Sequence, residues 1–201
     1  MPVKARIFDI GDVLEVNPRT GWPGRWADRL GVEVGEFERC LDRIWSPGAT
    51  GAVTLAEIEK QTGDALGLHQ AAITAMMEDA WAEYVGSLNR ELASYFASLR
   101  PRYKTAILSN SFVGAREREQ EAHGFHEMCD VIVYSHEVGC LKPDPRIYRV
   151  ACDLLVVAPE EAVLVDDVQV NVDGANAVGM AGITFATNAQ AIADLETHLT
   201  G

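Results

Sequence analysis

Basic residues are scarce in this chain. Its 201 residues include 17 Lys and Arg against 30 Asp and Glu, which gives a formal net charge of −13 at pH 7. A surface of this sign repels polyphosphates, so nucleic acid is not an expected partner. An anionic ligand would have to be met by a few positioned cations or by a metal ion, because the overall field opposes its approach.

Cysteine pairs and long apolar runs are also missing. The four cysteines show no C-x-x-C spacing, and no apolar run approaches the roughly 20 residues that span a membrane. The pattern of a signal peptide does not precede the first apolar segment. We therefore expect reduced thiols in a cytoplasmic protein that has no membrane partner. The sequence leaves the oligomeric state, monomer or homodimer, open.

Short apolar segments alternate with helical patterns along most of the chain. Five segments have the apolar, β-branched composition of strands: residues 3–8, 104–108, 131–134, 162–165 and 182–185. Alternation of strands and helices is typical of a parallel, doubly wound sheet, so we predict the α/β class. The chain is 48% hydrophobic, which suits the core that such a sheet needs.

A long helical stretch separates the first two predicted strands. Thr54 and Glu57 have the spacing of a capping box that opens a helix, and residues 69–84 carry apolar side chains at helical spacing. We predict a small helical cap over residues 16–86, inserted after the first strand, and an α/β core over residues 1–15 and 87–201. A helix over residues 88–99 is expected to lead back into the core.

Polar residues follow the predicted strands at their carboxyl ends. Asp9 follows the first strand, Ser109 and Asn110 the second, and Asp166 and Asp167 the fourth. Ligands of open parallel sheets bind at this edge. Three carboxylates gathered there raise one another's pKa, and a divalent cation would relieve that conflict. Oxygen ligands without His or Cys favour Mg²⁺ over Zn²⁺.

A single lysine, Lys142, follows Lys104 in the sequence and lies in the loop after the third strand. It would supply the cation that the acidic crevice needs, although an ordinary loop lysine is the alternative. Asp166 and Asp167 could cap a helix instead of binding a metal, and residues 109–111 could likewise be a helix cap. The N–H groups of such a helix end would still form an anion site.

Four motifs occur in a fixed order at these strand ends. They read FDIGDVL at 8–14, LSNS at 108–111, GCLKPDP at 139–145 and VDDVQVN at 165–171. In order and relative spacing they resemble the four motifs of the haloacid dehalogenase superfamily. The insert after the first motif is similar to the small cap of that superfamily's first cap class. The resemblance implies a Rossmann-like core with a helical cap.

The resemblance also implies a function, an Mg²⁺-dependent phosphatase of small phosphorylated metabolites, sugar phosphates among them. Asp9 would attack phosphorus and form an aspartyl-phosphate. Ser109 and the backbone N–H of Asn110 would hold the phosphoryl oxygens, and Lys142 would neutralise charge on Asp9 and the phosphate. The implied Mg²⁺ ligands are Asp9, the Gly11 carbonyl, Asp166 and Asp167.

Gly11 departs from the D-x-D first motif of most phosphatases in the superfamily. There the second carboxylate protonates the leaving oxygen and activates water, and loss of such a group costs roughly 10²–10⁴-fold. Three alternatives stay open: Asp12 replaces this carboxylate, a cap residue replaces it, or nothing does. Because a shift of one position in a tight loop points the side chain elsewhere, we favour the interpretation of Asp12 as a turn residue. An Asp-x-Gly motif also resembles glucose-1-phosphate phosphatase-like members, whose anomeric leaving group is easier to expel.

Two other functions stay open. In a 2-haloacid dehalogenase the same aspartate attacks carbon without a metal, and the pair at 166–167 argues against it because that pattern has serines there. A binding or regulatory protein that keeps the fold with weak or no turnover is the second, and Gly11 motivates it. The charged residues 116–121 are expected to form a solvated helix face. No role is assigned to the histidines His123, His126 and His136.

Overall fold

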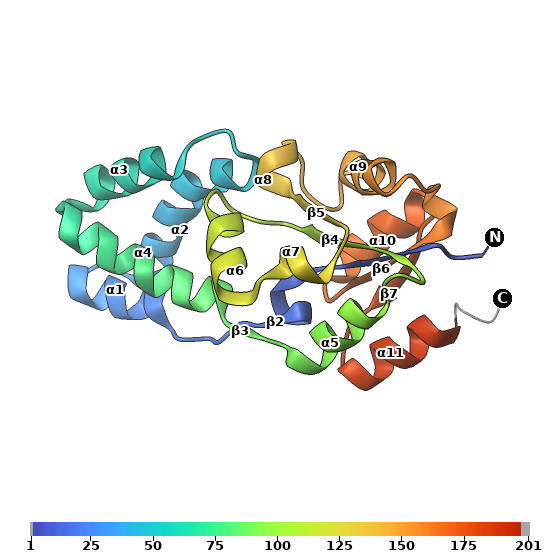
Figure 1. Cartoon of the computed structure of the whole chain (residues 1–201). Helices are drawn as coiled ribbons and strands as arrows, with labels where there is room; N and C mark the ends of the chain where they lie inside the picture. The colour runs from blue at the N-terminus through green and yellow to red at the C-terminus, as the bar shows by residue number, and fades with distance from the viewer. Residues whose placement is uncertain (1, 198–201) are drawn as a thin grey trace.

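A parallel five-stranded sheet forms the centre of the molecule (Figure 1). The computed structural model describes residues 2–197. The sheet has the order β5-β4-β1-β6-β7. Its strands are β1 (Ala5–Phe8), β4 (Lys104–Ser109), β5 (Val131–Tyr134), β6 (Ala162–Asp166) and β7 (Ala181–Thr184). The predicted α/β class is confirmed, and each strand lies within two residues of its predicted bounds.

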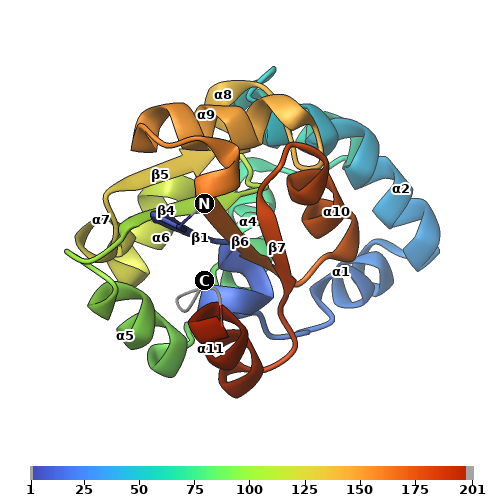
Figure 2. The ribbon, with the colours of Figure 1, turned by 90° about the vertical axis from the view of Figure 1, so that its right-hand side faces the viewer.

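Helices cover both faces of the sheet (Figure 2). On one face lie α5 (Arg90–Ser98), α7 (Phe125–Met128) and α11 (Asn188–Thr197), and on the other α9 (Pro145–Leu155) and α10 (Gln169–Ala177). Successive strand residues point to opposite faces, so Phe8 enters one core and Ile7 the other. The central strand β1 is therefore buried at every residue, as expected for a doubly covered parallel sheet.

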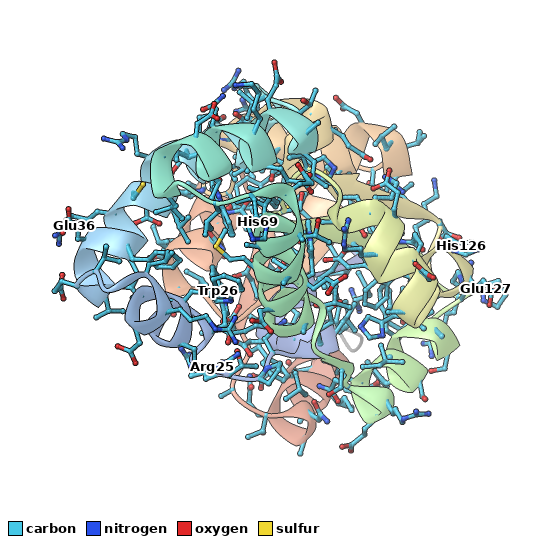
Figure 3. The ribbon with its side chains drawn as sticks, turned by 90° about the vertical axis from the view of Figure 1, so that its left-hand side faces the viewer. Arg25, Trp26, Glu36, His69, His126 and Glu127 are labelled. Atoms are coloured by element: carbon cyan, nitrogen blue, oxygen red, sulfur yellow. The ribbon has the colours of Figure 1, made fainter. Side chains whose placement is uncertain are left out.

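A separate group of helices lies beyond the sheet, at the left of Figure 1. Its elements are α1 (Trp22–Leu30), α2 (Val34–Trp45), the 3₁₀ turn η2 (Ser46–Thr50), α3 (Leu55–Leu66) and α4 (Gln70–Val85). The capping box at the start of α3 is present, with the Glu57 carboxylate 2.7 Å from the Thr54 nitrogen. The indole N–H of Trp26, a residue labelled in Figure 3, donates to Asp79 at 2.7 Å and so joins α1 to α4.

A two-stranded antiparallel ribbon joins these helices to the sheet. In it β2 (Glu15–Val16) pairs with β3 (Ser87–Leu88), with Val16 opposite Ser87. We propose this ribbon as the boundary between the cap, residues 16–86, and the core. The helix expected over 88–99 begins later, as α5 at Arg90, because Leu88 belongs to the ribbon and Asn89 caps the helix. Within residues 2–197 every helix is too short or too polar to cross a membrane.

Candidate active site

Asp9 directly follows β1 and is held by backbone groups on both sides. Its carboxylate accepts a hydrogen bond from the Ile10 N–H at 2.8 Å, and its own N–H donates to the Val165 carbonyl at 2.9 Å. The chain then enters the tight turn η1 (Ile10–Leu14). Asp12 in this turn has a φ of 51° and an exposed side chain, and its N–H donates to Asn17 at 2.9 Å. These features support the interpretation of Asp12 as a turn residue.

Neither the backbone conformation nor crowding requires a glycine at position 11. Its φ of −59° and ψ of 134° are open to any residue. A Cβ atom added at Gly11 would meet only Asn17 Oδ1, at an ordinary distance of 3.6 Å. The Gly11 position, two residues after Asp9, therefore has room for a Cβ atom.

Lys142 lies between Asp9 and Asp166. Its Nζ is 2.9 Å from Asp9 Oδ1 and 2.6 Å from Asp166 Oδ2, and it donates to the Leu108 carbonyl at 2.8 Å. The side chains of Lys142 and Asp166 are fully buried. Its hydrogen bonds to Leu108 and Asp166 fix the orientation of Lys142 from the two strands beside β1, and its charge stays paired with Asp9.

The side chain of Asn110 fixes the loop that carries Lys142. Its amide nitrogen donates to the Lys142 carbonyl at 3.0 Å, and its amide oxygen accepts from the Lys142 N–H at 2.7 Å. This two-way bond connects the end of β4 to the loop before α9. The sequence pointed only to the backbone N–H of Asn110, because a side-chain bond over 32 positions leaves no local pattern.

Three carboxylates meet beside this lysine. Asp9, Asp166 and Asp167 each offer an oxygen that lies within 4.8 Å of the others. Burial raises the pKa of Asp9 to about 7, and Lys142 opposes the shift. Burial and the charge of Asp166 also raise the pKa of Asp167. Such a group of oxygen donors, crowded and short of positive charge, has the chemistry of a divalent cation site.

The oxygens of Asp166 are already in use. Oδ1 accepts from the Val168 N–H at 2.9 Å and from the Asn171 amide at 3.0 Å, and Oδ2 accepts from Lys142. Asp167, the neighbouring carboxylate, is half-buried. Asp166 therefore holds Lys142 in place, and both of its carboxylate oxygens already accept hydrogen bonds.

The residues at the end of β4 border a cavity. Ser109 is buried, and with Asn110 and Gly11 it lines a space of about 240 Å³. The next helix, α6 (Ala115–His123), begins only after Gly114, so residues 109–111 do not cap it. Instead the N–H of Ser111 donates to the Ser135 hydroxyl at 2.8 Å. The alternative of a helix cap at this point is wrong.

The sequence profile of one protein family covers most of the chain, including all the site residues described above. The profile of the haloacid dehalogenase-like hydrolases matches residues 4–179. This chain is a haloacid dehalogenase-like hydrolase. The predicted superfamily is thereby confirmed, whereas the branch within it is not assigned by this match.

Curated relatives of the hydrolase have different activities. The (S)-2-haloacid dehalogenase 1 of a Pseudomonas strain is 34% identical over 195 residues, which cover 89% of this chain and 82% of that protein. The D-ribitol-5-phosphate phosphatase of Bacteroides thetaiotaomicron is 26% identical over 183 residues, 85% of each chain. The chain spans about a fifth of another relative, the bifunctional epoxide hydrolase 2 of Rattus norvegicus, since the match covers 21% of that protein.

Solved structures share the fold of the hydrolase. A haloacid dehalogenase family enzyme of Bacteroides thetaiotaomicron, crystallised with magnesium and inorganic phosphate, superposes with a TM-score of 0.77 at 20% sequence identity. The match covers 92% of this chain and 94% of that one. At this identity the likeness establishes the common fold.

Two buried glutamates of the hydrolase escaped prediction from the sequence. Glu15 and Glu119 are each 1% exposed and line the cavity beside Ser109. The expected solvated face at residues 116–121 is therefore wrong at Glu119, which accepts a hydrogen bond from the Tyr134 hydroxyl at 2.6 Å. Glu15 lies between apolar residues in the segment VLEV at 13–16. That apolar context was the available sign that Glu15 is buried. Nothing local distinguishes Glu119 from its charged neighbours.

Burial makes these glutamates hard to ionise. It raises the pKa of Glu15 to about 9, with the charge of Glu119 adding to the shift, and the pKa of Glu119 to about 7. His123 Nε2 lies 3.3 Å from Glu15 Oε1, but it is also 3.1 Å from the Val85 carbonyl. Within residues 2–197, Oε1 of Glu15 has no hydrogen-bond partner.

Replacing Glu15 by glutamine is expected to stabilise the hydrolase at pH 8 and to change its stability little at pH 5. The carboxyl has a pKa of about 9 in the fold against an ordinary 4.5, so the unfolded chain ionises first as the pH rises. Stability is lost between those two values at about 1.4 kcal/mol per pH unit, so the variant gains a few kcal/mol at pH 8.

Urea unfolding at the two pH values measures this difference. Glu121→Gln, the same change at an exposed position of α6, is the control and should have no pH-dependent effect. An equal effect of Glu15→Gln at both pH values would contradict the prediction.

The remaining histidines do not assemble a metal site. His136 Nδ1 lies 2.6 Å from the Ser111 hydroxyl, and His126 is exposed and points outward (Figure 3). In the described part of the chain, the three aspartates form the one cluster of His, Cys, Asp or Glu with metal-ligand spacing.

Proposed function

We propose that the hydrolase is an Mg²⁺-dependent phosphatase of small phosphorylated metabolites that acts through Asp9. The observation that carries this proposal is the convergence of Asp9, Asp166 and Asp167, within 4.8 Å of one another, beside the buried Lys142. The relative that acts on D-ribitol 5-phosphate supports it, and so does the shared fold with an enzyme crystallised with magnesium and phosphate.

The proposed Mg²⁺ ligands are Asp9, Asp167 and the Gly11 carbonyl, with Asp166 adjacent and committed mainly to Lys142. The donor set fits Mg²⁺, since every side chain in it is a carboxylate and His and Cys take no part. Bound Mg²⁺ would supply the positive charge that neutralises the carboxylates and attracts a phosphate. The net charge of −13 makes that attraction necessary.

In the proposed reaction an oxygen of Asp9 attacks phosphorus, and the bond from phosphorus to the leaving oxygen breaks. The leaving oxygen keeps the bonding electrons and takes a proton from solvent, because Gly11 offers none. Water then attacks phosphorus of the aspartyl-phosphate, releasing inorganic phosphate and the Asp9 carboxylate. Ser109 and the N–H of Asn110 hold the phosphoryl oxygens, and Lys142 favours the ionised form of Asp9 against the effect of burial.

Replacing Gly11 by aspartate is expected to raise turnover of simple alkyl phosphates by about 10²-fold, the low end of what a positioned acid contributes. The backbone at Gly11 suits any residue, and a Cβ atom there makes only an ordinary contact with Asn17. Turnover of p-nitrophenyl phosphate, whose leaving group needs little protonation, should rise far less. Steady-state kinetics with both substrates measure the contrast, and Gly11→Asn is the control for size. An equal gain from the asparagine would rule out acid catalysis.

A second candidate function is 2-haloacid dehalogenation, favoured by 34% identity to a dehalogenase over most of both chains. There Asp9 would attack the carbon that carries the halogen, halide would leave, and water would hydrolyse the ester. That chemistry has no need for the acid pair at 166–167. We therefore rank it below the phosphatase.

Removal of divalent metal separates the two. With EDTA, hydrolysis of p-nitrophenyl phosphate is expected to fall at least ~10²-fold and to return with added Mg²⁺. Chloride release from (S)-2-chloropropionate in the presence of EDTA would instead establish the dehalogenase. A broad screen of phosphorylated metabolites, hexose 1-phosphates included, tests the glucose-1-phosphate phosphatase-like branch. No turnover of any compound would favour a binding or regulatory protein.

A further inference from the structure

A second cavity, of about 250 Å³, is lined mainly by aromatic side chains of the helical region. Its rings form a connected set. Trp22 and Trp45 are stacked, with centroids 5.8 Å apart and planes at 15°, and Phe112 lies 5.7 Å from Trp45 and 5.8 Å from Trp81. Tyr84 meets Trp81 edge to face, at 5.2 Å. The cavity therefore presents ring faces and edges from several directions.

This aromatic cavity adjoins the space beside the proposed nucleophile. Glu83 and Tyr84 line both cavities, and the second one also contains Gly11, Ser109 and Asn110. A phosphoester held at Ser109 and Asn110 therefore has the aromatic cavity within reach of its leaving group, past Tyr84.

The linings of the two cavities include carboxyl groups and no basic side chain among the described residues. Glu83 lines both cavities, and Glu15 and Glu119, whose burial disfavours the ionised form, line the one beside Ser109. Across residues 2–197, lysine and arginine are missing from both linings. The guanidinium of Arg118, which is not a lining residue, lies 4.2 Å from the Trp81 centroid. A leaving group with a second negative charge would meet the Glu83 carboxylate, whereas a cation would find ring faces and that carboxylate.

We propose that the leaving group of the natural substrate is an alkylated ammonium alcohol, as in phosphocholine. The proposal rests on the proposed phosphatase function and names its substrate class. A quaternary ammonium group is attracted to aromatic faces and needs no hydrogen-bond partner, which matches a lining with few polar groups. Its charge also makes the attached alcohol easier to expel than a simple alkanol, and that suits a site with Gly11 in place of an acid.

The test compares phosphocholine with 3,3-dimethylbutyl phosphate, a neutral ester of the same shape. We expect kcat/KM to be about tenfold higher for phosphocholine, within the range that cation–π contacts give in a desolvated site. Glucose 1-phosphate should be a poorer substrate than phosphocholine. A ratio near one, or a preference for the neutral ester or the hexose ester, overturns the proposal.

Two variants locate the preference. Glu83→Gln keeps the size and an acceptor for Thr20, which the carboxylate now binds at 2.6 Å, and Trp45→Leu removes one ring. Each is expected to bring the ratio of the two kcat/KM values at least threefold closer to one. Glu78→Gln, an exposed change on the same helix as Glu83, is the matched control and should keep the wild-type ratio. Circular dichroism checks that Trp45→Leu folds. If Trp45→Leu is unfolded, the result with Glu83→Gln alone decides the test.

Failure of this inference is distinguishable from failure of the phosphatase proposal. Mg²⁺-dependent turnover of p-nitrophenyl phosphate with no preference for phosphocholine refutes only the substrate class. Absence of turnover of both refutes the two together. Binding gives a second readout. Phosphocholine should change the tryptophan fluorescence of Asp9→Asn protein at lower concentration than the neutral ester does, and the reverse order contradicts the proposal.

Discussion

Replacing Asp9 by asparagine is expected to abolish Mg²⁺-dependent turnover of p-nitrophenyl phosphate, with a loss of roughly 10⁴-fold or more. The amide has no anionic oxygen to attack phosphorus, yet it can still accept the Ile10 N–H bond that holds Asp9 in the wild type. The fold should therefore survive while the chemistry stops. Steady-state kinetics with the purified variant measure the loss, and thermal unfolding verifies the structure.

Asp12→Asn is the matched comparison for this result. It makes the same chemical change three positions along, at an exposed turn residue whose left-handed backbone asparagine also adopts. We expect turnover within about threefold of wild type, because the backbone N–H of Asp12, not its side chain, makes the bond to Asn17. A loss as large as that of Asp9→Asn would assign the missing acid to Asp12. Full activity of Asp9→Asn would refute the aspartyl-phosphate route.

Replacing Lys142 by methionine is expected to damage both activity and stability. Activity should fall by roughly 10²–10³-fold, as after removal of one charge-stabilising donor. The change also leaves Asp9 and Asp166 buried without their cation, although Asn171 and Val168 still bond Asp166. Breaking a buried ion pair from one side costs about 3–5 kcal/mol. Urea unfolding without divalent ions measures the stability, and p-nitrophenyl phosphate the activity.

Lys60→Met is the control for the loss of a lysine. Lys60 is exposed and pairs with Asp64 within α3, at 2.6 Å, and exposed pairs contribute little to stability. Both activity and unfolding should match wild type within error. If Lys142→Met were as stable as Lys60→Met, Lys142 would not be the element that holds the two carboxylates together.

The part of the site that lies at strand ends could be predicted from the sequence. Asp9, Ser109 and Asp166 each follow an apolar run, and parallel strands bring their carboxyl ends to one edge. The register of β1 with β4 and β6 places them there, since Phe8 lies opposite both Ile107 and Val165. The fold class followed from the same alternation of strands and helices.

Contacts between distant segments could not be predicted in this way. The side-chain amide of Asn110 forms two hydrogen bonds with the backbone of Lys142. Glu119, on a helix of charged residues, accepts a hydrogen bond from the Tyr134 hydroxyl. Both depend on which elements pack together, and helical spacing alone does not tell a buried acid from a solvated one. The aromatic cavity is of the same kind, because Trp22, Trp45 and Phe112 come from three separate segments.

The β2–β3 ribbon has a consequence for how this chain can diverge. The polypeptide departs from the core at Val16 and returns at Ser87, and the two residues are direct neighbours. The excursion begins and ends at one spot, so its length and composition are free to change without displacing Asp9 or the strands beside it. Changes within residues 16–86 can therefore accumulate while the residues at the strand ends keep their positions.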